Sequence, residues 1–184
     1  MEFPTEKFEI IYADPCWKYK CTETHCEGKS TGGASTHYNV MALGALKKLP
    51  VKNIRSENCL LYMWATGPLL DEAIELGQSW GFKFLTMAFV WNKNITMVGH
   101  YTLSSCEYVL LFKHGSAPKP RGTRNERQYL LETRSKRHSE KPSEIRDRIT
   151  RMHPTQKKIE LFSRHLVDGW SCWGNDPDIL SNDK

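Results

Sequence analysis

Short apolar runs alternate with polar and glycine-rich stretches along this chain. Runs rich in β-branched and aromatic residues predict strands, and apolar residues recurring every three or four positions predict helices. The predicted strands are residues 8–13, 59–65, 84–91, 107–113, 157–162 and 170–173. The predicted helices are residues 40–49, 69–80 and 142–152. This alternation predicts an α/β fold with a mostly parallel sheet and helices on both of its faces.

We expect a single domain over residues 1–184, because neither a repeat nor a linker divides the chain. Two polar segments, 18–38 and 113–141, are predicted to be mobile loops that contact substrate. The second holds nine lysines and arginines against three acids, a balance that suits contact with phosphates. A solvated loop is the alternative interpretation. The predicted phosphate contacts are Arg121, Arg124, Arg127 and Arg137.

The composition excludes several classes of protein. A formal net charge of +5 permits a polyanionic partner without demanding one. No apolar run is long enough to span a bilayer, and the N-terminus lacks a signal-peptide pattern, so we expect a cytoplasmic protein without a membrane partner. Cys16, Cys21, His25 and Cys26 are not spaced as in common zinc sites, so no metal is expected.

Candidate chemistry concentrates where the first predicted strand ends, at Asp14-Pro15-Cys16-Trp17. Pro15 cannot continue a central strand, so Asp14 should lie at the carboxyl edge of the sheet, where α/β folds bind ligands. The Asp14 carboxylate and the Pro15 carbonyl can accept both hydrogens of an amino group, and the Trp17 ring can stack on a base. A simple turn, with Asp14 as a helix cap, fits these residues equally well.

A second candidate is Glu160, an acid inside an otherwise apolar predicted strand. Burying a carboxylate is costly unless a donor bonds to it, and ribose hydroxyls are donors of this kind in dinucleotide folds. The chain contains neither a GxGxxG motif nor a P-loop, so a ribose-bearing cofactor would need another cradle.

Taken in order, these motifs resemble the Asp-Pro-Pro-Trp adenine-N6 methyltransferases, the family of the catalytic subunit of the mRNA adenosine methyltransferase. The compact microbial and phage members are most similar in size. The segments that carry the resemblance are residues 13–17, 38–41, 61–67, 91–93, 106–107, 138–144, 158–164 and 169–175. The resemblance implies a Rossmann-like methyltransferase fold with the catalytic motif early and the cofactor strand late. It also implies S-adenosylmethionine as the cofactor and nucleic acid as the partner.

The resemblance assigns roles to individual residues. Those it implies for the cofactor are Asp14, Lys141, Glu160, Arg164 and Asn175. Those it implies for catalysis and for the acceptor base are Asp14, Pro15, Trp17 and Tyr38. Lys141 would reach the methionyl carboxylate, and Glu160 and Arg164 would serve the ribose side.

Cys16 departs from the family pattern, which has a second proline there. A cysteine adds an N–H and loosens the turn. An active adenine-N6 methyltransferase is the main prediction, and a catalytically weak or inactive nucleic-acid-binding subunit is the alternative. DNA is favoured over RNA because the bare domain carries no added RNA-binding module. A homodimer is among the expected assemblies.

Overall fold

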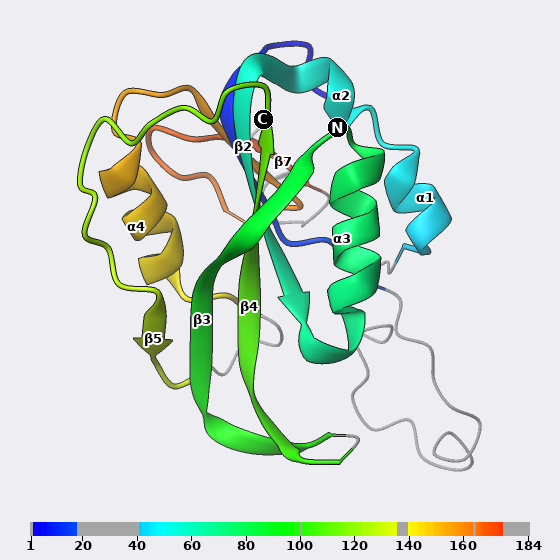
Figure 1. The fold of residues 1–184 in the computed structure, drawn as a ribbon, viewed down its shortest axis with the longest axis vertical. Helices are drawn as coiled ribbons and strands as arrows, with labels where there is room; N and C mark the ends of the chain where they lie inside the picture. Colours follow the sequence, from blue (N-terminus) through cyan, green and yellow to red (C-terminus); the bar gives the residue numbers. More distant parts are fainter. Residues whose placement is uncertain (1, 18–40, 100, 136–139, 164, 175–184) are drawn as a thin grey trace.

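The computed structural model describes residues 2–17, 41–99, 101–135, 140–163 and 165–174. In this part of the chain seven strands form one sheet in the order β5-β3-β4-β2-β1-β6-β7 (Figure 1). The strands are β1 (Phe8–Ala13), β2 (Arg55–Thr66), β3 (Lys83–Val98), β4 (Leu103–His114), β5 (Tyr129–Leu131), β6 (Lys158–Leu161) and β7 (Ser171–Trp173). The helices are α1 (Leu43–Lys47), α2 (Val51–Ile54), α3 (Leu70–Ser79) and α4 (Ser143–Met152), with a 3-10 turn, η3 (Gly67–Leu69), before α3.

The predicted α/β, Rossmann-like fold with a mostly parallel sheet is confirmed. The parallel pairs are β1–β2, β1–β6, β6–β7 and β3–β5, and only β4 runs antiparallel to its neighbours, β2 and β3. β1 lies at the centre of the parallel part, where Tyr12 pairs with Tyr62 on one side and with Glu160 on the other. The end of β1 therefore lies beside the ends of β2 and β6.

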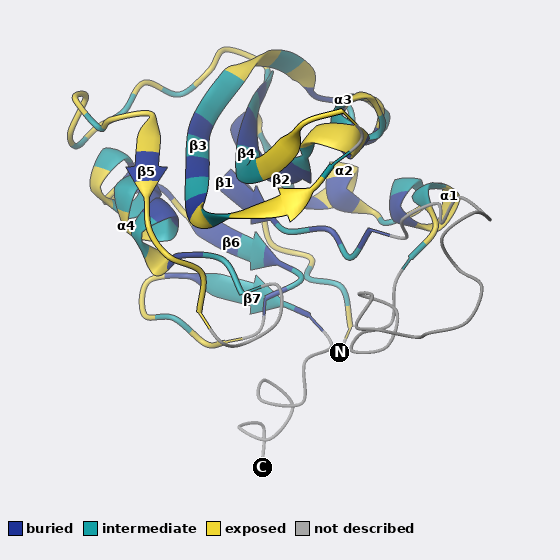
Figure 2. Cartoon of the chain, turned by 90° about the horizontal axis from the view of Figure 1, so that it is seen from below, coloured by how far each residue is buried: buried dark blue, intermediate teal, exposed yellow. Residues whose placement is uncertain are grey.

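Helices cover both faces of the sheet (Figure 2). Alternation along β2 sends Met63 to one face, where it packs in a cluster with Leu76 of α3. It sends Tyr62 to the other face, into a cluster with Ile145 of α4. The two apolar clusters hold the helical layers in place and thereby fix the position of α4 beside the ends of β1 and β6.

β3 continues well past its predicted end at residue 91. Asn94 adopts a left-handed conformation with φ of 55°, and its N–H donates to the side chain of Asn92 at 2.9 Å. The pairing with β4 shifts register between Asn92 and Met97. The polar pair Asn92-Lys93 therefore marks an irregularity within a long hairpin and not the end of a strand.

Two further elements differ from the prediction. In place of one helix over residues 40–49, the chain forms α1 and then α2, which begins directly after Pro50. Segment 113–141, expected to be a loop, contains β5, which pairs with β3 from Val90 to Asn92. A strand of three residues in a charged segment is too short to leave an alternation pattern. Residues 18–38, the other expected loop, lie outside the described part of the chain.

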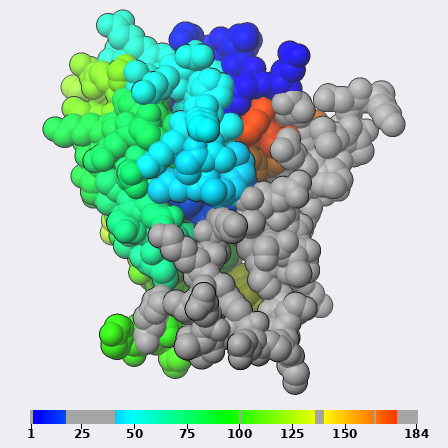
Figure 3. Space-filling model, turned by 90° about the vertical axis from the view of Figure 1, so that its right-hand side faces the viewer, coloured from blue at the N-terminus to red at the C-terminus, as the bar shows by residue number. Residues whose placement is uncertain are grey.

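The two ends of the described chain lie side by side (Figure 3). The Phe3 ring packs edge-to-face on Trp173 of β7, with ring centroids 4.9 Å apart. Trp173 makes a similar contact with Phe162 at 5.6 Å. The N-terminal segment is thus fastened beside the β6–β7 end of the sheet. Within the described ranges, no helix has the length and apolar character needed to cross a membrane.

Candidate active site

Asp14 follows β1 directly and stands at the carboxyl edge of the sheet. Its backbone N–H donates to the carbonyl of Leu161 at 3.4 Å, so the pairing of β1 with β6 extends to this residue. It caps none of the helices that the structure describes. Its carboxylate instead accepts a hydrogen bond from Lys141 Nζ at 2.8 Å. This contact favours the ligand-edge interpretation of Asp14 over the simple turn.

Lys141, just before α4, is held by opposite charges. Besides Asp14, its ammonium lies 3.6 Å from Glu107 Oε2 and 5.6 Å from the centroid of the Trp64 ring. Glu107 also accepts a hydrogen bond from Lys93 Nζ at 3.3 Å. The Lys141 side chain is only 14% exposed, so these contacts are weakly screened by water. Two carboxylates, one just after β1 and one in β4, therefore hold the Lys141 ammonium at this edge of the sheet.

Glu160, in β6, faces the same region and pairs with Arg146 of α4. Arg146 Nη1 donates to Glu160 Oε2 at 3.1 Å, and the two side chains are 17% and 15% exposed. Burial raises the pKa of the Glu160 carboxyl, and the neighbouring Arg146 guanidinium opposes that rise. The donor that the sequence argument required for a buried acid is thus partly supplied by the protein itself.

These groups line one cavity of about 350 Å³. Asp14, Lys141, Arg146 and Glu160 all contribute to its wall, although they come from three different parts of the chain. Its volume lies at the small end of the range for small-molecule sites, about 300–1,000 Å³. The structure therefore brings together three of the residues to which the sequence assigned a cofactor role.

Aromatic side chains form another part of the cavity wall. Tyr12, Trp64 and Trp91 line it, and Trp64 donates its ring N–H to the Tyr12 hydroxyl. Trp91 packs edge-to-face on Trp64 with ring centroids 6.0 Å apart, and donates its ring N–H to the carbonyl of Glu132 at 2.7 Å. Trp64 and Trp91 lie in segments that carry the family resemblance, but no role was predicted for either. Both are buried in the apolar cluster on the α4 side of the sheet, and the alternation of side chains along β2 and β3 was the available signal.

Phe162, immediately after β6, is a second residue that the sequence argument did not assign. It lines the cavity and has a left-handed backbone with φ of 63°. For a bulky residue this conformation costs about 1–3 kcal/mol and is found where a site constrains the chain. Its spacing of two from Glu160 was the only hint that it would share the same side.

Pro15 and Trp17, two predicted catalytic residues, do not line this cavity. Trp17 is only 7% exposed and packs in the apolar core, and its backbone N–H donates to the Pro15 carbonyl at 2.9 Å. The Cys16 carbonyl accepts a hydrogen bond from the N–H of Met41 at 2.9 Å. Burial raises the pKa of the Cys16 thiol, so it is protonated at neutral pH. The turn at Cys16 is therefore closed by backbone hydrogen bonds.

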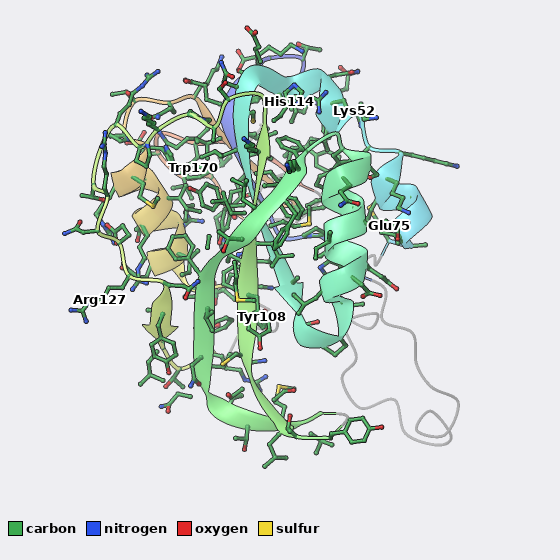
Figure 4. All side chains as sticks on the ribbon, in the orientation of Figure 1. Lys52, Glu75, Tyr108, His114, Arg127 and Trp170 are labelled. Atoms are coloured by element: carbon green, nitrogen blue, oxygen red, sulfur yellow. The ribbon has the colours of Figure 1, made fainter. Side chains whose placement is uncertain are left out.

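Three of the predicted phosphate contacts lie in the described part of the chain, and they are spread along the molecule. Arg121 reaches Glu9 and Thr155 at 3.4 Å each, next to the starts of β1 and β6 and so at the edge opposite Asp14. Arg124 is exposed, and Arg127 points away from the molecule beside α4 (Figure 4). In this structure these arginines do not gather around the cavity.

Four predicted site residues lie outside the described part of the chain: Tyr38, Arg137, Arg164 and Asn175. Among the residues that are described, no group of three or more histidine, cysteine or acidic side chains is arranged to hold a metal ion.

The chain matches the model of the MT-A70 family over residues 8–176. It is 43% identical to the type II methyltransferase M.MunI of Mycoplasma sp, over 94% of this chain and 79% of the relative. It is 27% identical to a putative N(6)-adenosine-methyltransferase MT-A70-like protein of Medicago truncatula, over 92% of this chain and 26% of the relative. It is 25% identical to the N(6)-adenosine-methyltransferase catalytic subunit METTL3 of Homo sapiens, over 97% of this chain and 31% of the relative.

Proposed function

Because the chain belongs to the MT-A70 family, we propose that it transfers a methyl group from S-adenosylmethionine to the N6 amine of adenine in DNA. The observation that carries the proposal is the contact between Asp14 and Lys141 at the carboxyl edge of the sheet, in one cavity with Glu160. These three residues are the described ones to which the family resemblance gives cofactor roles.

The side chains present fit this cofactor. The Lys141 ammonium is a partner for the methionyl carboxylate. Glu160 Oε2 is bonded to Arg146, whereas Oε1 has no donor among the described residues and is available to a ribose hydroxyl. The electron-rich faces of Trp64 and Trp91 suit a positive charge. S-adenosylmethionine, when bound, would supply a methyl group carried on a positively charged sulfur.

Asp14 would then serve the acceptor base. Its carboxylate can accept one hydrogen of the adenine amine once Lys141 turns to the cofactor's carboxylate. The family resemblance gives the other hydrogen to the Pro15 carbonyl, which lies outside the cavity wall and keeps a second lone pair beside its bond from the Trp17 backbone N–H. Held in this way, the amine presents its nitrogen lone pair to the methyl group, and such positioning can supply several kcal/mol of barrier reduction.

The amine does not need a strong base, because its proton becomes acidic only as the new N–C bond forms. Asp14 is placed to take that proton or to pass it to water. The base must leave its stack to reach this edge, so single strands or flipped adenines are the proposed substrates.

DNA is proposed over RNA because the relative at 43% identity is a type II methyltransferase, the kind that modifies DNA. The relatives named as adenosine methyltransferases are 25–27% identical and much longer than this chain. A binding subunit without turnover remains the alternative. The hydrogen bond between Asp14 and Lys141 supports the catalytic proposal, because a subunit that only binds nucleic acid would not need these two residues paired.

Methyl transfer from labelled S-adenosylmethionine to matched single- and double-stranded DNA and RNA, followed by nucleoside analysis, tests the proposal. We expect N6-methyladenine in DNA. Asp14→Asn should lower the rate by about 100-fold or more while circular dichroism remains unchanged. Asp71→Asn, at an exposed position of α3, is the matched control and should have normal turnover. Labelled RNA without labelled DNA would overturn the choice of substrate, and no transfer to any strand would favour the binding subunit.

A further inference from the structure

Arg146 is a charged side chain of the cavity wall to which neither the sequence argument nor the proposed mechanism gives a role. It projects from α4 between two buried positions of that helix, Ile145 and Ile149. Its carbonyl accepts a hydrogen bond from Thr150 Oγ1 at 2.9 Å, and its guanidinium bonds Glu160 Oε2 at 3.1 Å. The helix thus presents the guanidinium to β6 from a firmly packed position.

We propose that Arg146 is a positioning residue for the cofactor: it holds the Glu160 carboxylate by one oxygen and leaves the other, Oε1, directed to the ribose hydroxyls. This inference rests on the proposed function, which places S-adenosylmethionine in this cavity. Arg146 itself acts through Glu160, so its effect on the cofactor is indirect.

The cost of the arrangement argues against a merely structural pair. Arg146 Nε is buried, and no group in the described residues accepts its hydrogen. A buried donor without a partner is destabilising, so a side chain chosen for stability alone would avoid it. Arg146 uses only part of its donor set on Glu160. This is expected if its role is to orient that carboxylate and not to add stability.

The charges around Glu160 make Arg146 its main stabiliser. Asp14 and Tyr12 face Glu160 from β1 and its end, and His165 faces it from the segment after β6. Burial and the Asp14 carboxylate raise the pKa of Glu160, whereas Arg146 lowers it, with a smaller effect of His165 in the same direction. Without Arg146 the carboxyl would take up a proton at a higher pH and lose an acceptor.

The other arginines of α4 provide a control. Arg151 bonds Glu126 and Glu144 at 2.7 and 2.9 Å, is 43% exposed, and does not line the cavity. Arg151→Met therefore removes a guanidinium and its ion pairs from the same helix without changing the surroundings of Glu160.

The experiment is calorimetric titration of S-adenosylmethionine into the wild type, Arg146→Met, Arg146→Lys and Arg151→Met across about pH 6–8.5, with thermal unfolding of each protein alone. Arg146→Met should weaken binding by about tenfold at neutral pH, the scale of a disturbed hydrogen bond to a charged group. Its affinity should fall further as the pH is lowered, starting at a higher pH than in the wild type. Arg146→Lys should restore part of the affinity, and Arg151→Met should bind like the wild type.

A double-mutant cycle separates positioning through Glu160 from a direct contact. In a Glu160→Gln background, Arg146→Met should cause no further loss of affinity. An equal loss in both backgrounds, or wild-type affinity and pH profile in Arg146→Met and Arg146→Lys, would overturn the inference and leave the proposed function standing. A wild type that does not bind S-adenosylmethionine would overturn both. If Arg146→Met fails to fold, Arg146→Lys alone decides, through its pH profile.

Discussion

A single ammonium, that of Lys141, faces two carboxylates: Asp14, just after β1, and Glu107, in β4. In the proposed mechanism it exchanges Asp14 for the carboxylate of the cofactor. In this exchange one carboxylate replaces another as the partner of the same cation. In the proposed mechanism Lys141 therefore couples binding of the cofactor to the release of Asp14 for the acceptor base.

We expect Lys141→Met to weaken S-adenosylmethionine binding by about tenfold or more, since a hydrogen bond to a charged group contributes about 1.5–3 kcal/mol. Isothermal titration calorimetry measures the affinity of each variant for S-adenosylmethionine. Lys47→Met, which removes the ion pair of Lys47 with Glu75 on the outer side of α1 and α3, is the control and should leave the affinity unchanged. If Lys141→Met bound S-adenosylmethionine as tightly as Lys47→Met does, the methionyl carboxylate would bind elsewhere than at Lys141.

His153, at the end of α4, is fully buried and bonded to the Tyr62 hydroxyl at 3.0 Å. Burial, with a smaller effect of the Lys158 ammonium, lowers the pKa of His153 to about 4. A histidine in an unfolded chain titrates near pH 6.5, so between these values the folded protein binds fewer protons than the unfolded chain. The stabilising contribution is therefore complete above about pH 6.5 and is lost as the pH falls toward 4.

The measurement is the free energy of urea unfolding of the wild type and of His153→Gln between about pH 4 and 7.5. The wild type should lose about 2–3 kcal/mol more than the variant over this range. Glutamine retains an acceptor for Tyr62 but does not titrate. Parallel curves for the two proteins would show that His153 is not the source of the acid sensitivity.

At the scale of elements, α3 can approach the sheet closely because Gly77 lies against Phe112 of β4. A Cβ at Gly77 would lie 2.4 Å from the Phe112 ring, whereas one at Gly44 in α1 would meet nothing within 4 Å. Gly77→Ala should destabilise the protein by about 1–3 kcal/mol through overpacking. Gly44→Ala should be neutral or stabilise it by up to about 1 kcal/mol through helix propensity. Urea unfolding measures both variants, and a Gly77→Ala protein as stable as Gly44→Ala would contradict the contact.

Elements with their own apolar pattern could be predicted from the sequence, and those defined by a neighbour could not. β1 and the core of β2 are apolar runs that need no partner to be recognised. β5 exists because β3 offers it an edge, and the far half of β3 exists because β4 pairs with it across a bulge. The same limit applied to the site. Asp14 and Glu160 stand out in the sequence because they interrupt apolar runs. Arg146 is one of several charged residues on α4, and only its packing in the structure distinguishes it from the others.

At the scale of the whole molecule, the basic segment runs from one edge of the sheet to the other. Arg121 lies at the edge where β1 and β6 begin, and Arg134 is exposed and its N–H donates to the carbonyl of Lys93 at 3.4 Å, next to residues of the cavity wall. Contact of this segment with phosphates stays a prediction, but its arginines should differ in importance.

We expect Arg134→Gln to weaken DNA binding and to reduce its salt dependence by about one unit of slope, as for the loss of one phosphate contact. Arg121→Gln, at the opposite edge, should leave the slope close to that of the wild type. Fluorescence anisotropy over a series of salt concentrations measures both. The reverse result would place the nucleic acid along the edge away from Asp14.

Sedimentation of the same samples would test the predicted homodimer.

Asp14 and Lys141 meet in space although 127 positions separate them in the chain, and β1 is enclosed by β2 on one side and by β6 on the other. Contacts of such long sequence separation form late, because the chain loses the entropy of closing a large loop before the contact can stabilise it. During synthesis Asp14 emerges long before Lys141 and β6, so it has neither its partner nor its neighbouring strand at first. The cavity that holds Asp14 and Lys141 therefore forms only after β6 has paired with β1, and species that lack this pairing should lack the proposed methyl-transfer activity.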